Sequence, residues 1–477
     1  MTNLMRQAIN LCAILALTAG MTGCIRYEAK PLMPMQSAAA LEARGLEDAS
    51  LRQFLATNAP ALAREWPRKS WDIESLTWAG WHFHSSIAVA RAQYEVARAG
   101  IVTAGGRLNP VISSVFGYSA TAGTGLNPWM PGLSLDVPIE TAGKRNDRIE
   151  QARHASFAAY FGVATAAWQV RTHIRATALE WAAARKRQTF LETQLQAQDE
   201  MIRSLEQRVT AGALTAVELM PARVQRTRIL VDLDDAKRVS MEALPRLADA
   251  IGLPARALQG VNISMDVFAG PSPRPAASLN IPERRQQVLQ QRPEILAALE
   301  EYAATQASLQ LEIARQYPDV HLSPGYQWDQ GNSKWTLGMS LELPVLNQNQ
   351  GPIAEAKARR EAAAVRFMAL QARVLSDLDL ASASLQAAQA HQAAMEPVRA
   401  ALETQRRSQQ SLVDAGALDR LDLLATRVEL AANELALFEA RYKVEQAFLT
   451  WLDASQVGPL AAPSDAAKPI TPQQTKP

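Results

Sequence analysis

The chain has 477 residues and a net charge of +2, and hydrophobic residues make up 48% of it although aromatic residues make up only 6%. Alanine supplies much of the apolar share, and this composition is typical of long helices in close contact rather than of a bulky globular core. The near-neutral charge argues against a dedicated nucleic-acid-binding protein, which needs a concentrated basic surface.

The N-terminal segment has the pattern of an export signal. Residues 1–23 combine Arg6, an apolar run and small residues directly before Cys24. The ending MTGC resembles the lipobox of bacterial lipoproteins, which predicts that Cys24 is lipidated and anchors the chain in outer-membrane lipid. An exported soluble protein with an incidental cysteine is the alternative. Residues 24–72 are then expected to form a lipid-anchored N-terminal extension.

Residues 73–254 are predicted to form a first repeat of helices and two strands. The strands are expected over 111–119 and 132–138, where GLSLDVP alternates apolar and polar side chains. The stretch 146–209 contains no proline and predicts one helix roughly 95 Å long. Its later part carries a heptad seam typical of coiled coils. The seam consists of Leu191, Leu195, Gln198, Ile202, Leu205 and Val209.

The sequence RVTAGALTAVEL at 208–219 predicts a tight turn between two helices. Gly212 can adopt the left-handed conformation that ends a helix. Thr215 and Glu218 can cap the helix that follows. The segment 255–280 is rich in proline and glycine and is expected to form a linker.

Residues 281–455 repeat the same plan, with GMSLELPV at 338–345 matching GLSLDVPI at 132–139. Strands are expected over 319–328 and 334–343. A second long helix is predicted over residues 353–412. Its seam is predicted to consist of Val365, Met368, Ala372 and Leu375.

The second elbow, LVDAGALDRLDL at 412–423, shares AGAL with the first. Gly416 is expected to end the long helix, and Asp419 with Asp422 can cap the next one. Residues 456–477 are expected to be a disordered tail.

The predicted strands alternate apolar and polar side chains, as strands of an outer-membrane barrel do, although any half-buried sheet gives the same pattern. In an exported chain the barrel is favoured, with Trp129, Trp328 and Trp335 as candidates for the membrane interface. Four strands are too few to close a barrel, and their open edges predict that several chains share one.

Catalytic and metal-binding motifs are missing from the sequence. His82 and His84 stand close together, but no third ligand accompanies them, and packing at a helix interface is favoured over a metal site. No phosphate-binding loop, nucleophile triad or paired-carboxylate motif stands out. The sequence therefore predicts neither an enzyme nor a cofactor.

The duplicated order of elements, the sequence LDVPIETAGKR at 135–145 and the two elbows resemble the TolC-like outer-membrane efflux proteins over nearly all of the mature chain. The part PIETAGKR is most similar to the heavy-metal and cation efflux subgroup. The resemblance implies a mainly α fold with a small β part. Long helical hairpins would form a trimeric α-barrel, and four strands per chain would join a shared twelve-stranded β-barrel in the outer membrane.

By the same resemblance, the protein is a passive conduit for metal cations or drugs in the outer membrane, with a tunnel in the periplasm. Its partners would be two further copies of the chain, a periplasmic adaptor and an inner-membrane pump of the resistance-nodulation-division type. The alternatives are a conduit for type I protein secretion and a periplasmic adaptor lipoprotein.

The resemblance also makes the two elbows the periplasmic tips of the hairpins. Asp422 and Asp419 are then candidates for the channel entrance, and helix capping is the alternative role for Asp422. Asp414 and Asp419 stand where the first tip has Thr210 and Thr215, which makes the second tip the more acidic. Adaptor docking is expected at Val209, Gly212, Leu214, Thr215, Glu218, Val413, Gly416 and Leu418.

Overall fold

The computed structural model describes residues 26–264, 268 and 281–456. The predicted signal, Cys24 and all but the first residue of the predicted tail lie outside these ranges. The chain divides into two units between Arg44 and Gly45, a boundary that falls inside the segment 24–72. Among the described residues of the first unit there is one helix, α2 (Pro34–Glu42).

The second unit contains the remaining helices and strands. None of the helices in the described part of the chain is both long and apolar enough to cross a membrane. The helices of the first repeat and the residues before it are α3 (Ala49–Asn58), α4 (Pro60–Ala63), α5 (Ile73–Phe83), α6 (Ser85–Ala104), α7 (Lys144–Thr210), α8 (Ala216–Ile251) and the 3-10 helix η1 (Ala255–Leu258). Those of the second repeat are α9 (Ile281–Gln291), α10 (Pro293–Ala314), α11 (Gln350–Asp414) and α12 (Arg420–Ser455).

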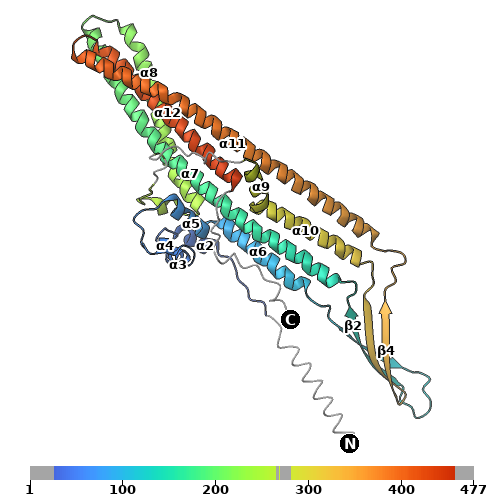
Figure 1. Cartoon of the computed structure of the whole chain (residues 1–477). Coiled ribbons are helices and arrows are strands. Elements are labelled where there is room, and N and C mark those ends of the chain that lie inside the picture. Colours follow the sequence, from blue (N-terminus) through green and yellow to red (C-terminus); the bar gives the residue numbers. More distant parts are fainter. Residues whose placement is uncertain (1–25, 265–267, 269–280, 457–477) are drawn as a thin grey trace. The chain divides into compact units, whose positions relative to one another are not determined.

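The longest helices, α7 and α11, run from the strands to the tips, and α8 and α12 lie alongside them (Figure 1). With 67 residues, α7 is about 100 Å long. Its predicted seam is confirmed: Leu191, Ile202 and Leu205 are buried, and Leu195 and Val209 pack against the same clusters. Gln198 is also buried, and its amide donates a hydrogen bond of 2.9 Å to the carbonyl of Ala222 in α8.

The seam predicted for α11 is wrong. Val365 and Met368 are exposed, and the buried stripe lies on another face of the helix. That stripe packs against α9 and α12, because those helices and not the apolar content of α11 decide which face is covered. It consists of Val374, Leu378, Ala381 and Leu385.

The four described strands form one antiparallel sheet in the order β1-β2-β3-β4. The pairing of β2 with β3 joins the two repeats, from Gly132 opposite Gln327 to Ile139 opposite Val320. A two-residue turn connects β3 and β4, and Gln330 at φ 47° precedes Gly331 at φ 102°, as tight hairpins require. The strands are β1 (Val111–Tyr118), β2 (Trp129–Ile139), β3 (Val320–Asp329) and β4 (Asn332–Leu341).

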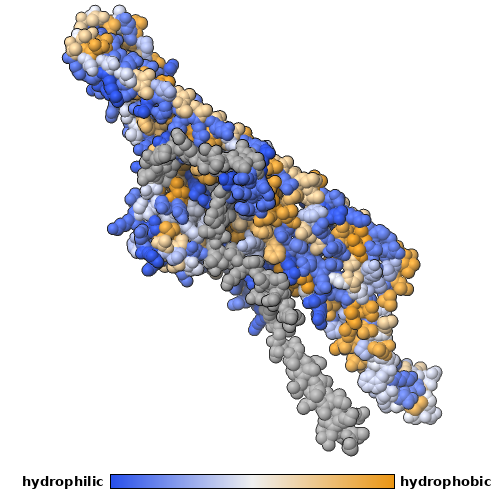
Figure 2. Space-filling model, viewed as in Figure 1, coloured by the Kyte–Doolittle hydropathy of each residue, from blue (hydrophilic) through white to orange (hydrophobic). Residues whose placement is uncertain are grey.

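The sheet has one apolar and one polar face, and Figure 2 shows hydrophobic side chains gathered over the strand region. Tyr118 pairs with Trp129 across β1 and β2, and Tyr326 pairs with Trp335 across β3 and β4. The ring centroids lie 5.1 Å and 4.9 Å apart, respectively. The register places all four aromatic side chains on the apolar face, toward the hairpin turns.

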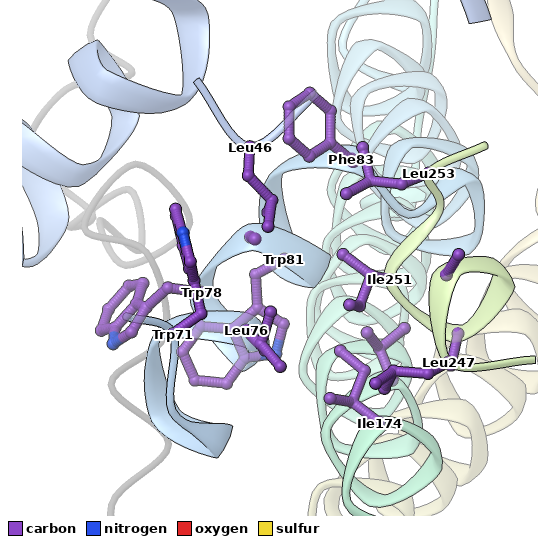
Figure 3. Close-up of a cluster of buried hydrophobic side chains, with 14 of the residues drawn as sticks. Leu46, Trp71, Leu76, Trp78, Trp81, Phe83, Ile174, Leu247, Ile251 and Leu253 are labelled. Atoms are coloured by element: carbon purple, nitrogen blue, oxygen red, sulfur yellow. The ribbon is translucent and has the colours of Figure 1, made fainter. Parts of the chain in front are cut away.

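The largest hydrophobic cluster joins α5 and the residues before it to the middle of α7 and the C-terminal end of α8 (Figure 3). The indole of Trp81 lies in this cluster and donates a buried hydrogen bond of 2.9 Å to the carbonyl of Ala167 in α7. Leu46 and Trp71 pack into the same cluster. The residues from Gly45 onward therefore belong to the helical body.

Candidate functional site

The two elbows have the same backbone conformation. Gly212 and Gly416 both have φ +70°, in the left-handed region that favours glycine. In the first elbow the amide of Ala213 donates to the carbonyl of Arg208 at 2.8 Å, and in the second that of Ala417 donates to Leu412 at 2.8 Å. These bonds satisfy the last carbonyl groups of α7 and α11. Each repeat is thus a helical hairpin with a glycine tip.

The helices that leave the two elbows are capped differently. Glu218 accepts hydrogen bonds from the amide and the hydroxyl of Thr215, at 2.7 Å and 2.9 Å. These bonds hold the pKa of the Glu218 carboxyl below its ordinary value. At the second tip Asp419 is the N-cap residue, and its carboxylate accepts from the amide of Leu421 at 3.0 Å.

An ion pair joins the two tips. The guanidinium of Arg208, at the end of α7, bonds to the carboxylate of Asp419. The bond from Arg208 is the main reason why the pKa of Asp419 is lowered, and the capping bond adds to it. The same pair raises the pKa of Arg208, with a smaller contribution from Asp422. Asp419 therefore has two structural tasks, since it caps α12 and ties the second tip to the first.

Asp422 lies in the first turn of α12 and is exposed. Asp419 holds the N-cap position, and no hydrogen bond or ion pair among the described residues involves Asp422. Its carboxylate faces solvent with Arg208 as a nearby opposite charge. The capping role that was the alternative for Asp422 thus falls to Asp419.

The residues expected to dock an adaptor fall into two groups by exposure. The apolar members Val209, Leu214, Val413 and Leu418 are half-buried, and Leu214 packs on the cluster beneath the first tip. The small and polar members are exposed, and they are Gly212, Thr215, Glu218 and Gly416.

Sequence reasoning missed Arg208 as a site residue. A signal was available, because Arg208 stands where the second elbow has Leu412. An extra positive charge at one tip favours an acidic partner at the other. The partner could not be found from the sequence, since Arg208 and Asp419 are far apart along the chain.

The histidines singled out in the sequence form hydrogen bonds with serine side chains. His82 shares a hydrogen bond of 2.9 Å with Ser50, and His84 shares one of 2.8 Å with Ser86 and caps α6. Burial is the main reason why the pKa of His84 is lowered. In the described ranges no group of three or more histidine, cysteine or acidic side chains is placed to hold a metal ion.

The motif PIETAGKR ties the start of α7 to the start of β3. The ammonium of Lys144 lies 2.8 Å from the carboxylate of Asp319 and 2.6 Å from the carbonyl of Tyr317. The hydroxyl of Thr141 donates to the carbonyl of Pro318 at 2.6 Å. The motif therefore fixes the junction between helices and strands where the two repeats meet.

These observations define a class of protein in which two copies of a helical hairpin are joined to one shared sheet. The family model described as Outer membrane efflux protein matches residues 84–253 and 285–452. The chain belongs to this family.

Two curated relatives are 25% identical to the chain. The cobalt-zinc-cadmium resistance protein CzcC of Cupriavidus metallidurans matches over 258 residues, which cover 54% of this chain and 60% of that protein. The pyoverdine export outer membrane protein OpmQ of Pseudomonas aeruginosa matches over 301 residues, which cover 58% of this chain and 62% of OpmQ. Both matches span less than two thirds of the relative's length.

The fold is also similar to solved structures. The outer membrane protein VceC of Vibrio cholerae superposes with a TM-score of 0.65 at 20% identity, over 81% of this chain and 96% of VceC. At this level of identity the likeness concerns the fold.

Proposed function

We propose that the chain is the outer-membrane channel of a tripartite efflux system, in which three copies form one tunnel. The two-faced sheet is the observation that carries this proposal. Its apolar face exposes Trp129 and Trp335 to the surroundings of the chain, where aromatic side chains would lie at the membrane interface. Its polar face, with Asp136 bonded to His321 and Ser323, would line the lumen.

The cargo is proposed to be small, and passage through the channel passive. CzcC is named for cobalt, zinc and cadmium, and OpmQ for pyoverdine export, so metal cations and drug-like molecules are the two classes to test. We infer no catalytic activity. The proposed partners are a periplasmic adaptor at the tips and an inner-membrane pump of the resistance-nodulation-division type. The alternative within the same fold is a conduit for type I protein secretion.

Cys24 is proposed to carry the lipid anchor. Radiolabelled palmitate should be incorporated into the full chain and not into Cys24→Ala. Equal labelling of the two proteins would contradict the anchor without affecting the channel.

Conductance is the direct test of the channel. Purified protein reconstituted into a planar bilayer should give discrete, ohmic current steps. Protein that stays monomeric and gives no current would overturn the proposal.

Asp422 is proposed to line the entrance of the tunnel, next to Asp419. Three like charges around a narrow axis attract multivalent cations. Asp422→Ala should therefore weaken the block of the current by a trivalent cobalt ammine complex. Glu429→Ala is the matched control, because Glu429 is also exposed on α12 but lies beyond the tip. Unchanged block in Asp422→Ala would remove Asp422 from the entrance.

We propose that the exposed members of the set of tip residues dock the adaptor. Exchanging Thr215 and Asp419 between the tips should impair efflux in cells that contain the pump and adaptor. Full efflux with the exchanged residues would show that the difference between the tips has no role in docking.

A further inference from the structure

A pocket of about 490 Å³ lies where α7, α12 and the start of α5 meet. This volume is typical of sites that bind small molecules. Glu445 is buried and forms part of its inner end, whereas Asp72 and Glu74 are exposed at its rim. The apolar part of its lining consists of Ile73, Leu179, Phe448, Leu449 and Leu452.

The carboxyl group of Glu445 has no polar partner in the described part of the chain. Glu445 is only 6% exposed, and no hydrogen bond or ion pair among the described residues involves it. Burial raises the pKa of this carboxyl to about 7, and the charge of Arg441 partly offsets the rise. At neutral pH a large share of the group is therefore protonated, and its O–H can donate a hydrogen bond into the pocket. Buried polar groups are normally hydrogen-bonded, so Glu445 is a group that a ligand would satisfy.

The guanidinium of Arg175 lines the same pocket from α7. Arg175 is half-buried, and no hydrogen bond or ion pair among the described residues involves it. Its Nε is buried without a hydrogen-bond partner. Burial is the main reason why the pKa of Arg175 is lowered to about 10, and the neighbouring charge of Arg171 lowers it further against the opposite effect of Glu74. The cation Arg171 thus acts on Arg175 more strongly than the anion Glu74, which favours a bound negative charge.

The first repeat lacks an equivalent of this carboxyl. The helices α8 and α12 both have 36 residues, and their starts and ends differ by the same offset, 420 − 216 = 204 and 455 − 251 = 204. Glu445 therefore corresponds to Met241, which is 71% exposed. The contact with α7 covers an apolar stripe of α12, where Leu435 packs on the cluster around Leu191, whereas its counterpart Val231 on α8 is 64% exposed. The pocket thus depends on the packing of α12 on α7.

We propose that this pocket binds a small aliphatic carboxylate, with its chain against the leucine and phenylalanine side chains and its carboxylate facing Arg175 and Glu445. A carboxylate can accept a charge-assisted hydrogen bond from the guanidinium and a second one from the O–H of Glu445. One ligand group thus gives a partner to both side chains. An alkylammonium ion would pair with Glu445 but would be repelled by Arg175, and a neutral alcohol would leave Arg175 without an anion. Short-chain and medium-chain fatty acids are the class that fits.

Calorimetry with octanoate tests the site. The full chain in lipid nanodiscs should give saturable heat at pH 7 after subtraction of a titration into nanodiscs without protein. Arg175→Gln should weaken binding by about tenfold or more, because a hydrogen bond to a charged group is lost. Arg185→Gln is the matched control, since Arg185 is exposed on the same helix and does not line the pocket. Its affinity should stay within about twofold of wild type.

Glu445→Gln identifies the charge of the ligand. The amide of glutamine still donates a hydrogen bond, so octanoate should bind this variant about as well as wild type. Octylamine should bind neither protein measurably. Octylamine that binds wild type and is lost in Glu445→Gln would replace the carboxylate by a cation and overturn the proposal.

A second variant locates the site where Arg175→Gln does not fold. Leu449→Trp fills the pocket from a half-buried position and leaves both polar side chains in place. It should abolish the saturable heat of octanoate. Octanoate binding that is equal in wild type and in Leu449→Trp would place the bound carboxylate elsewhere and overturn the site.

Binding at this pocket is separable from conduction, because the pocket lies apart from the tips and from the sheet. Protein that conducts but gives no saturable heat with octanoate loses the site and keeps the channel. Protein that binds octanoate with the expected loss in Arg175→Gln but gives no current keeps the site and loses the channel.

Discussion

The two repeats have one plan and two different surroundings. In each, a long helix reaches a glycine tip and a 36-residue helix returns from it. The returning helix of the second repeat is covered by α7, whereas the returning helix of the first exposes the corresponding stripe. At their C-terminal ends both helices are buried, α8 in the largest hydrophobic cluster of the described chain (Figure 3) and α12 in the cluster that contains Trp451. Duplicated sequence therefore gives equal elements, and neighbours decide which faces are buried.

Substitutions at the C-terminal ends of α8 and α12 are expected to change the free energy of unfolding the most. Gly252 and Gln456 are equivalent, and both have a left-handed backbone, with φ 86° and φ 43°. A Cβ atom on Gly252 would lie 2.9 Å from the Cα of His84 and 2.9 Å from the carbonyl oxygen of Phe83. The left-handed backbone alone costs alanine about 1–2 kcal/mol, and this clash with backbone atoms adds to it. Gly252→Ala should lower the free energy of unfolding in urea by more than 1 kcal/mol, and an unchanged midpoint would show that the base is loosely packed.

Glu445 on α12 is buried, whereas its counterpart in the first repeat is exposed. It is 6% exposed, and burial raises the pKa of its carboxyl to about 7, partly offset by Arg441. A raised pKa means that the folded state gains from protonation, so stability is highest below the ordinary pKa and falls as the pH rises toward 7. Glu445→Gln should remove this fall and stabilise the protein by about 1 kcal/mol at pH 8, after allowance for solvent screening.

The control for Glu445 is its counterpart in the first repeat, Met241, which is 71% exposed. Met241→Glu should leave the pH dependence of stability unchanged, because an exposed carboxylate stays hydrated. If Glu445→Gln and wild type lost stability in parallel between pH 5 and pH 8, the burial of Glu445 would not control the pH response.

Gln456 should respond to substitution in the opposite direction from Gly252. Glycine adopts the left-handed conformation without strain, so Gln456→Gly is expected to raise the free energy of unfolding by about 0.5–1 kcal/mol. The melting temperature in detergent measures it. A lower melting temperature would mean that contacts of the Gln456 side chain outweigh the backbone strain.

The smallest expected effect concerns the ion pair between the tips. Arg208 and Asp419 are both partly exposed, so Arg208→Ala and Asp419→Ala should leave global stability nearly unchanged. The pKa of Asp419 is lowered, so its contribution is present above the ordinary pKa of an aspartate and is lost as the pH falls through the lowered pKa. Proteolysis at the tips should be faster in both variants at pH 7, and this difference from wild type should shrink as the pH falls toward the lowered pKa of Asp419. A double variant that is cleaved faster than either single variant would contradict the pair as the cause.

Local features were predicted well from the sequence. The elbow glycines, the capping by Thr215 with Glu218 and by Asp419, and the seam of α7 depend on residues close together in the chain, so their conformation could be inferred before any packing was known. The resemblance to the outer-membrane efflux proteins was confirmed by the match of the family model to both repeats.

What the sequence by itself determined was the order of elements and the position of the turns, because backbone geometry and side-chain periodicity are local properties. Only the tertiary structure decided which stripe of α11 is buried, which acidic residue forms the ion pair between the tips and which carboxyl group is buried away from water. Val365 and Val374 are equally apolar, and Asp419 and Glu445 are equally ionisable in an unfolded chain. Their different fates follow from the helices that pack beside them.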